Sequence, residues 1–225
     1  MLSFIALWSF RNISEGLETQ SKAVDSLARR EQTKQLIQNR VLWPITLIKG
    51  LRGMALFALL TFLPLYLAND VGLSAFVRAA YIGLLIAIRI VAKPVAGYLS
   101  DKLGRKQILA PGLLWTGAIT LLLIFFGEGV VLPVLIALLG LFVYPDQPIL
   151  TAAFLDLVDD GVVSTALGIA SFFGFLLSAL SPMVVGAVYE FVGASAALYY
   201  IGSLFFVAAI LLVPLKLTRP HIVAV

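Results

Sequence analysis

The sequence predicts an all-α polytopic membrane protein with six transmembrane helices, and three observations support this class. The 225 residues are 61% hydrophobic and only 12% charged, whereas soluble domains are about half apolar and about a quarter charged. The apolar runs are about 20 residues long, which is the length a helix needs to cross the hydrocarbon core. They lack the in-out alternation of barrel strands, so helices are expected to satisfy the backbone in lipid.

The apolar runs also place the expected helices, which short turns join. The six predicted spans are 41–68, 77–99, 108–126, 130–154, 164–188 and 194–215. They form a predicted transmembrane domain over residues 41–215, followed by a tail over residues 216–225. Residues 1–10 are apolar but half as long as a span, so we interpret them as the end of a preceding transmembrane helix. Residues 11–40 carry six Lys/Arg and four Asp/Glu and are predicted to be a linker.

Basic residues set the predicted orientation. They gather in the linker, in the loop after the second span and in the tail, whereas the alternate loops are mainly acidic. Because cytoplasmic loops carry the excess of Lys and Arg, both termini are predicted to be cytoplasmic, in a protein of the plasma membrane. The acidic turn with Asp156, Asp159 and Asp160 falls on the same side, but acidic residues count little in this rule.

Four charged residues inside the spans are the candidates for solute binding or ion coupling: Lys49, Arg52, Arg89 and Asp146. A charge near the bilayer centre costs from about 2.5 kcal/mol upward, so each should face protein or water and have a partner. The leading hypothesis pairs Asp146 with Arg89 or Arg52, and a purely structural ion pair is the alternative. Lys49 is close enough to the membrane surface to extend its ammonium group to it. The excess of cations favours an anionic solute.

Small residues and prolines suggest how the helices pack. Ala170, Gly174 and Ser178 recur at four-residue spacing in the fifth span. Such a stripe lets two helices approach closely, so we predict that it is a packing surface. Prolines in the spans are expected to bend their helices.

The segment G-Y-L-S-D-K-L-G-R-K, residues 97–106, interrupts the apolar runs with a polar loop. Asp101 can pair with a neighbouring cation, and Gly104 permits a tight reversal between antiparallel helices. Gly97 leaves bare backbone for a close neighbour. The predicted loop and gating residues are Gly97, Asp101, Lys102, Gly104, Arg105 and Lys106.

This segment resembles the loop signature of the major facilitator superfamily of secondary transporters. Its position after the second span resembles the second half of such a transporter, helices seven to twelve. The resemblance implies that residues 1–10 end helix six and that residues 11–40 form the central cytoplasmic loop. It also implies a missing N-terminal six-helix half, across which the solute cavity would form and against which Asp101 and Arg105 would latch. Helices seven and ten line that cavity in the family, which favours Lys49 and Arg52 with Asp146.

The expected function is therefore transport of a small-molecule solute across the lipid bilayer by alternating access, driven by an ion gradient. A truncated half without transport activity, serving as an assembly partner or a gene fragment, is the alternative, and a homodimer of halves is a third possibility. An enzyme is not expected, because the only histidine, His221, lies in the tail and the chain has no cysteine. No cofactor or metal site is predicted. Nucleic-acid binding is not expected either, because the basic residues flank apolar spans.

Overall fold

The computed structural model of the chain describes Lys34 and residues 42–158, 163–215 and 217. The chain divides into two units, Met1–Asn39 and Arg40–Val225, and the fold described below is that of the second. The predictions for residues 1–10, for most of the 11–40 linker and for nearly all of the tail lie outside the described residues. Within the described residues every regular element is a helix, which confirms the all-α class.

The described part of the chain contains six long apolar spans, as the sequence predicts, and they are built from seven helices. The helices are α3 (Leu42–Asn69), α4 (Ala75–Leu103), α5 (Arg105–Phe126), α6 (Val131–Val143), α7 (Asp146–Leu155), α8 (Val163–Val192) and α9 (Ala194–Leu212). The predicted edges fall within four residues of the observed ones. The largest differences are at the ends of α4 and α8, each of which continues four residues further than its apolar run.

The fourth span differs from the prediction of one continuous helix over residues 130–154, because it is divided into α6 and α7. Tyr144 and Pro145 form the turn between them. Pro145 and Pro148 have no amide hydrogen, so the carbonyls four residues earlier lose their usual donors and the helix is interrupted. Apolar length alone does not reveal this break, since both parts together still cross the membrane as one span over Val131–Leu155.

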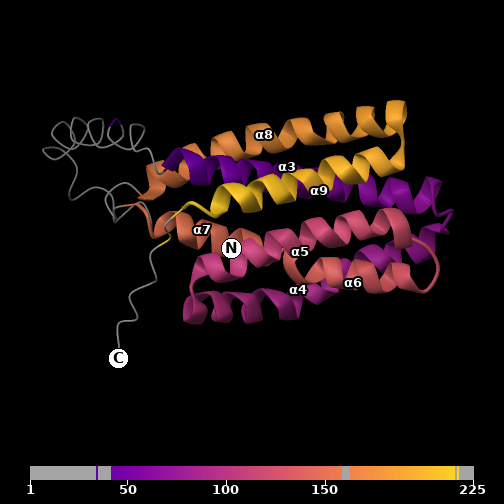
Figure 1. The fold of residues 1–225 in the computed structure, drawn as a ribbon, viewed down its shortest axis with the longest axis horizontal. Helices are drawn as coiled ribbons and strands as arrows, with labels where there is room; N and C mark the ends of the chain where they lie inside the picture. Colours follow the sequence, from indigo (N-terminus) through magenta and orange to yellow (C-terminus); the bar gives the residue numbers. More distant parts are fainter. Residues whose placement is uncertain (1–33, 35–41, 159–162, 216, 218–225) are drawn as a thin grey trace, which may run out of the picture. The chain divides into compact units, whose positions relative to one another are not determined.

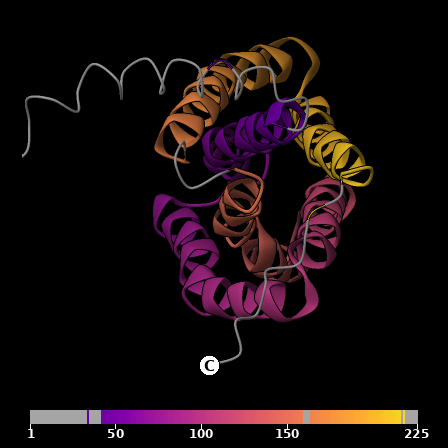
Figure 2. The same ribbon diagram turned by 90° about the vertical axis from the view of Figure 1, so that its left-hand side faces the viewer.

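The helices run along one another in a single bundle (Figure 1). α3 packs along α8 and also against α9, while α5 packs against α9 and α6, and α4 packs mainly against α6. The end-on view in Figure 2 shows α7 in the interior of the bundle, with α8 across the top and α4 at the lower left. The charged residues of α3 and α7 are thereby brought into the middle of the bundle.

The contact between α3 and α8 depends on small side chains. A Cβ atom at Gly53 would collide with the hydroxyl of Ser178, and one at Gly50 would lie 2.6 Å from Cδ1 of Leu177. Ala170, Gly174 and Ser178 are all buried. The prediction that this stripe is a packing surface is confirmed.

Two helices are much less covered than the rest. Over its most apolar stretch, α4 has 11% of its residues buried and α8 has 22%, against 44–50% for the other four spans. A Cβ atom at Gly83 or Gly97 of α4, or at Gly168 or Gly186 of α8, would meet no described atom within 4 Å. Both helices therefore present open surface that the described residues do not cover.

Candidate solute and coupling site

Arg52 on α3 and Asp146 at the start of α7 form an ion pair inside the bundle. Arg52 Nε donates to Asp146 Oδ2 at 2.8 Å, and Arg52 Nη2 donates to Asp146 Oδ1. Both residues are only 3% exposed. Of the two partners that the sequence proposes for Asp146, the structure selects Arg52. The parallel pair of hydrogen bonds is the strongest arrangement that a guanidinium and a carboxylate can form.

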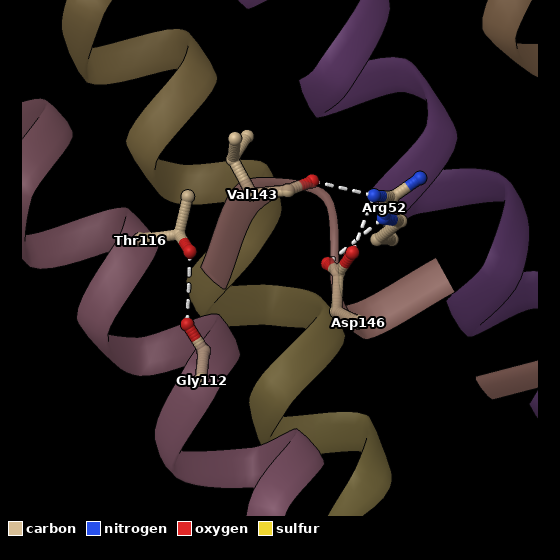
Figure 3. A network of polar contacts seen from close by, with 5 residues as sticks. All are labelled: Arg52, Gly112, Thr116, Val143 and Asp146. Carbon is tan, nitrogen blue, oxygen red and sulfur yellow. Dashed lines mark hydrogen bonds and ion pairs between the residues drawn. The ribbon is translucent and has the colours of Figure 1, made fainter. Parts of the chain in front are cut away.

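The break between α6 and α7 also contributes to this site. Arg52 Nη2 donates a second hydrogen bond, 2.6 Å long, to the backbone carbonyl of Val143 in the last turn of α6. Figure 3 shows the guanidinium between this carbonyl and the Asp146 carboxylate, with a third nitrogen that points away from both. On the neighbouring α5, the Thr116 hydroxyl donates to the Gly112 carbonyl at 2.9 Å and so is satisfied within its own helix. The interrupted span therefore supplies both the acid and a carbonyl that hold Arg52.

Arg89 and Lys49 lie on aromatic rings instead of on an acid. The guanidinium carbon of Arg89 is 5.1 Å from the centre of the Tyr144 ring, and Lys49 Nζ is 5.6 Å from that of Phe154. Cations at such distances are attracted by the negative face of the ring. The described residues give neither cation a carboxylate partner. Both rings come from the divided span, which thus contacts three of the four predicted charged residues in addition to providing Asp146.

A cavity of about 290 Å³, here named the Lys49 cavity, opens beside the ion pair between α3, α7 and α8. Its polar lining comprises Lys49, Arg52, Gln147, Thr151, Ser171 and Ser178. Leu56, Phe57, Leu150, Leu167 and Phe175 form most of the apolar lining. The cavity brings Lys49 and Arg52 together. It leaves Arg89 outside its walls.

The predicted loop residues form a second charged cluster, at the end of the bundle. Arg105 Nη1 donates to Asp101 Oδ1 at 2.8 Å, and Arg105 Nε donates to Asp156 Oδ2 at 2.5 Å. Lys106 donates to the carbonyls of Val213 and Leu215 beyond the end of α9. Arg105 and Lys106 therefore tie the starting turn of α5 to the ends of α4, α7 and α9 within the described chain.

The loop itself is shorter than the sequence suggests. α4 continues to Leu103 and α5 begins at Arg105, so Gly104 alone separates them, with φ of 110°. This left-handed conformation favours glycine and confirms the predicted tight reversal. Lys102 lies with Nζ 5.9 Å from the centre of the Tyr98 ring.

Sequence reasoning missed several members of these clusters. It considered Asp156 only as an acidic exception to the orientation rule, and it did not consider the Val143 carbonyl or the Phe154 ring. The spacing of Pro145 and Pro148 frees the carbonyls of Leu141 and Tyr144 and so does not single out Val143. Asp156 lies 51 residues from Arg105, and only the fold brings it there. Among the described residues no group of three His, Cys, Asp or Glu is placed to hold a metal ion.

Comparison with known proteins places this architecture in a family. Residues 82–224 match the family model of the Major Facilitator Superfamily. The chain belongs to this superfamily. It is also 24% identical over 182 residues to the cis,cis-muconate transport protein of Acinetobacter baylyi, a match that covers 80% of this chain and 43% of the relative. The chain therefore aligns with less than half the length of this relative.

Proposed function

We propose that this chain is the C-terminal half of a secondary transporter of the cell membrane, which moves a small solute by alternating access. The observation that carries the proposal is the Arg52–Asp146 pair, buried inside a transmembrane bundle beside an open cavity. Arg52 is ten residues into α3, or about 15 Å along the helix axis, near the middle of a core about 30 Å thick. Intramembrane ionisable groups mark solute and ion pathways, and transporters place their sites near the midplane.

Asp146 is the proposed coupling residue. Among the described acidic residues it alone is buried, and Arg52 is its ion-pair partner. When transport separates the pair, the carboxylate would have to find another cation or take up a proton, because an isolated charge is costly there. The name of the relative, a cis,cis-muconate transport protein, makes small organic carboxylates the first class of solute to test.

The test is uptake into proteoliposomes with and without an inward proton gradient. Asp146→Asn should abolish gradient-driven accumulation and leave solute exchange in place, because the neutral amide cannot release a proton. Glu190→Gln removes an exposed acid and is the matched control, expected to accumulate solute like the unchanged protein. Accumulation by Asp146→Asn that still follows the proton gradient would overturn the coupling role.

The open faces of α4 and α8 are the proposed contact with an N-terminal six-helix half. They are the least covered spans, and their outward glycines would let another helix approach closely. The chain has no cysteine, so Gly97→Cys introduces a single crosslinking site on this face. Phe125→Cys, on the exposed side of α5, is the control.

Crosslinking from Gly97→Cys, and not from Phe125→Cys, to a second membrane polypeptide or segment would support the proposal. A crosslink between two copies of this chain would favour a homodimer of halves over the proposed N-terminal half. The absence of any crosslink would argue against any partner on this face.

The motif end of the bundle is proposed to be cytoplasmic, together with both termini. The motif end carries Lys102, Arg105 and Lys106, while Glu128 lies at the opposite end. Single cysteines at Lys102 and Glu128 test this with a thiol reagent that does not cross membranes. In intact cells Glu128→Cys should react and Lys102→Cys should be protected, and the reverse pattern would invert the topology.

A further inference from the structure

The Lys49 cavity has a positive charge that the described residues do not balance. Its lining contains the cations Lys49 and Arg52. Asp146 neutralises Arg52 through two hydrogen bonds. Lys49 is half-buried, lies on the Phe154 ring and makes no ion pair with any described acid. Since a charge in the membrane interior needs a counter-charge or water, the cavity is suited to an anion.

The polar groups around Lys49 can complete such a site. Gln147 and Thr151 on α7 and Ser171 on α8 line the same cavity and can each donate a hydrogen bond. The third nitrogen of Arg52, Nη1, has no hydrogen-bond partner among the described residues, and Figure 3 shows it pointing away from Asp146. Donors from three helices therefore accompany the unbalanced ammonium group.

The remaining walls of the cavity are apolar, and they limit the size and polarity of the rest of the molecule that carries the anionic group. Leu56 and Leu150 are buried, while Phe57 and Phe175 are 41% and 63% exposed and leave the cavity open on one side. A volume of about 290 Å³ is at the small end of ligand pockets, which span about 300–1,000 Å³. The cavity is thus suited to a small molecule with one polar end and one apolar end.

We propose that the Lys49 cavity binds a small organic monocarboxylate, whose carboxylate pairs with Lys49 and whose apolar body lies against Phe57 and Phe175. A single unbalanced charge favours a monoanion, because a doubly charged phosphate ester would leave the cavity negative. This assignment rests on the proposed transport function for its biological meaning. Its physical basis is the lining of the cavity alone.

Binding of radiolabelled benzoate to the purified full chain in detergent tests the assignment. Unlabelled benzoate should compete, whereas benzamide, which has no charge, and acetate, which has almost no apolar body, should compete at least tenfold more weakly. Equal competition by benzamide would overturn the role of charge, and equal competition by acetate would overturn the role of the apolar wall. Competition by phenyl phosphate as strong as by benzoate would overturn the choice of a monocarboxylate.

Lys49→Gln should weaken benzoate binding about tenfold or more, because a hydrogen bond to a charged group is lost. Lys34→Gln removes the same charge at an exposed position outside the six spans and should bind benzoate unchanged. Ser171→Leu fills the cavity without altering its charge and should also block binding, so the test survives if one variant fails to fold. Normal binding by the folded Lys49→Gln or Ser171→Leu protein would overturn the proposal.

The experiment separates this proposal from the transport function. Benzoate binding that depends on Lys49, without uptake into proteoliposomes, would support the site and count against transport. Uptake of neutral solutes with no carboxylate binding would support transport and overturn the site. Repeating the binding with phosphatidylglycerol added tests a lipid headgroup as the occupant, and loss of benzoate binding through competition by this lipid would overturn the assignment to a soluble carboxylate.

Discussion

The two charged clusters of this molecule use the same groups in opposite surroundings. In the middle of the bundle, the side chains of Arg52 and Asp146 are 4% and 2% exposed. At the motif end, Arg105 is 12% exposed and its partners Asp101 and Asp156 are 64% and 28% exposed. Water and salt weaken the second cluster, whereas burial shields the first from most of their effect.

This difference indicates what each cluster can do. Removing one partner of a buried pair leaves the other charge uncompensated, which is costly. Protonation or separation of the Arg52–Asp146 pair can therefore be coupled strongly to a movement of the helices that carry it. An exposed network can rearrange at little cost, so the Arg105 cluster is suited to joining helix ends that separate and rejoin.

Loss of one member of the buried pair should have the largest effect. Arg52→Leu leaves Asp146 buried without its cation and should lower the free energy of unfolding by about 3–5 kcal/mol. Unfolding in mixed micelles with increasing denaturing detergent measures this. The double variant Arg52→Leu/Asp146→Leu removes both charges and should recover most of the loss, because apolar replacements of a buried pair are often neutral. A double variant as unstable as the single one would mean that packing of Arg52, and not charge, dominates.

The glycine contact beside the pair should come next. Gly53→Ala places a methyl group against the Ser178 hydroxyl and should destabilise the protein by about 1–3 kcal/mol. Ser178→Ala removes the colliding oxygen and leaves its Cβ at an ordinary 3.5 Å, so Gly53→Ala/Ser178→Ala should be restored. Thermal unfolding of the four proteins gives the coupling energy. Additive effects would show that the two residues do not meet. Gly97→Ala is the matched control, since its methyl group meets no described atom.

A buried hydroxyl at the other end of α3 should have an intermediate effect. Tyr66 donates to the carbonyl of Leu123 at 3.1 Å and lies close to that of Gly127 at 3.4 Å. Tyr66→Phe should cost about 1 kcal/mol, the usual contribution of one hydrogen bond. Tyr199→Phe is the control, because Tyr199 is 52% exposed. Equal unfolding midpoints for the two variants would show that the Tyr66 hydroxyl does not hold α3 to the end of α5.

The motif cluster should show the smallest effect. Arg105→Gln should cost at most about 1 kcal/mol, because its ion pairs are partly exposed. The loss should shrink further in high salt, which screens exposed pairs. Arg52→Leu should keep its full effect under the same conditions. A salt-independent loss of several kcal/mol at Arg105 would show that the two clusters do not differ as proposed.

Much of the fold could be predicted from the sequence, because the relevant signals are local. Apolar runs of about membrane length determine the six spans, and their edges fall within four residues of the observed helix ends. The tight turn at Gly104 was also predictable, because glycine adopts positive φ more readily than other residues. The small-residue stripe on α8 was predictable from the four-residue spacing of Ala170, Gly174 and Ser178, which is also a local pattern.

The candidate site was predictable only in part. Membrane depth singles out Lys49, Arg52, Arg89 and Asp146, because hydrocarbon makes any charge there exceptional. It does not say which of them meet. Arg52 and Asp146 are 94 residues apart, and no local pattern shows whether Arg52 or Arg89 lies beside the acid.

The sequence by itself therefore determined that this protein lies in a lipid bilayer, how many spans it has and which few charged residues lie within them. Each of these follows from the free-energy cost of placing a local segment in lipid. Only the tertiary structure decided that Arg52 pairs with Asp146, that a divided helix supplies the second acceptor and that no described acid pairs with Lys49 in its open cavity. These outcomes depend on how helices distant in the chain are rotated and packed, which no local segment specifies.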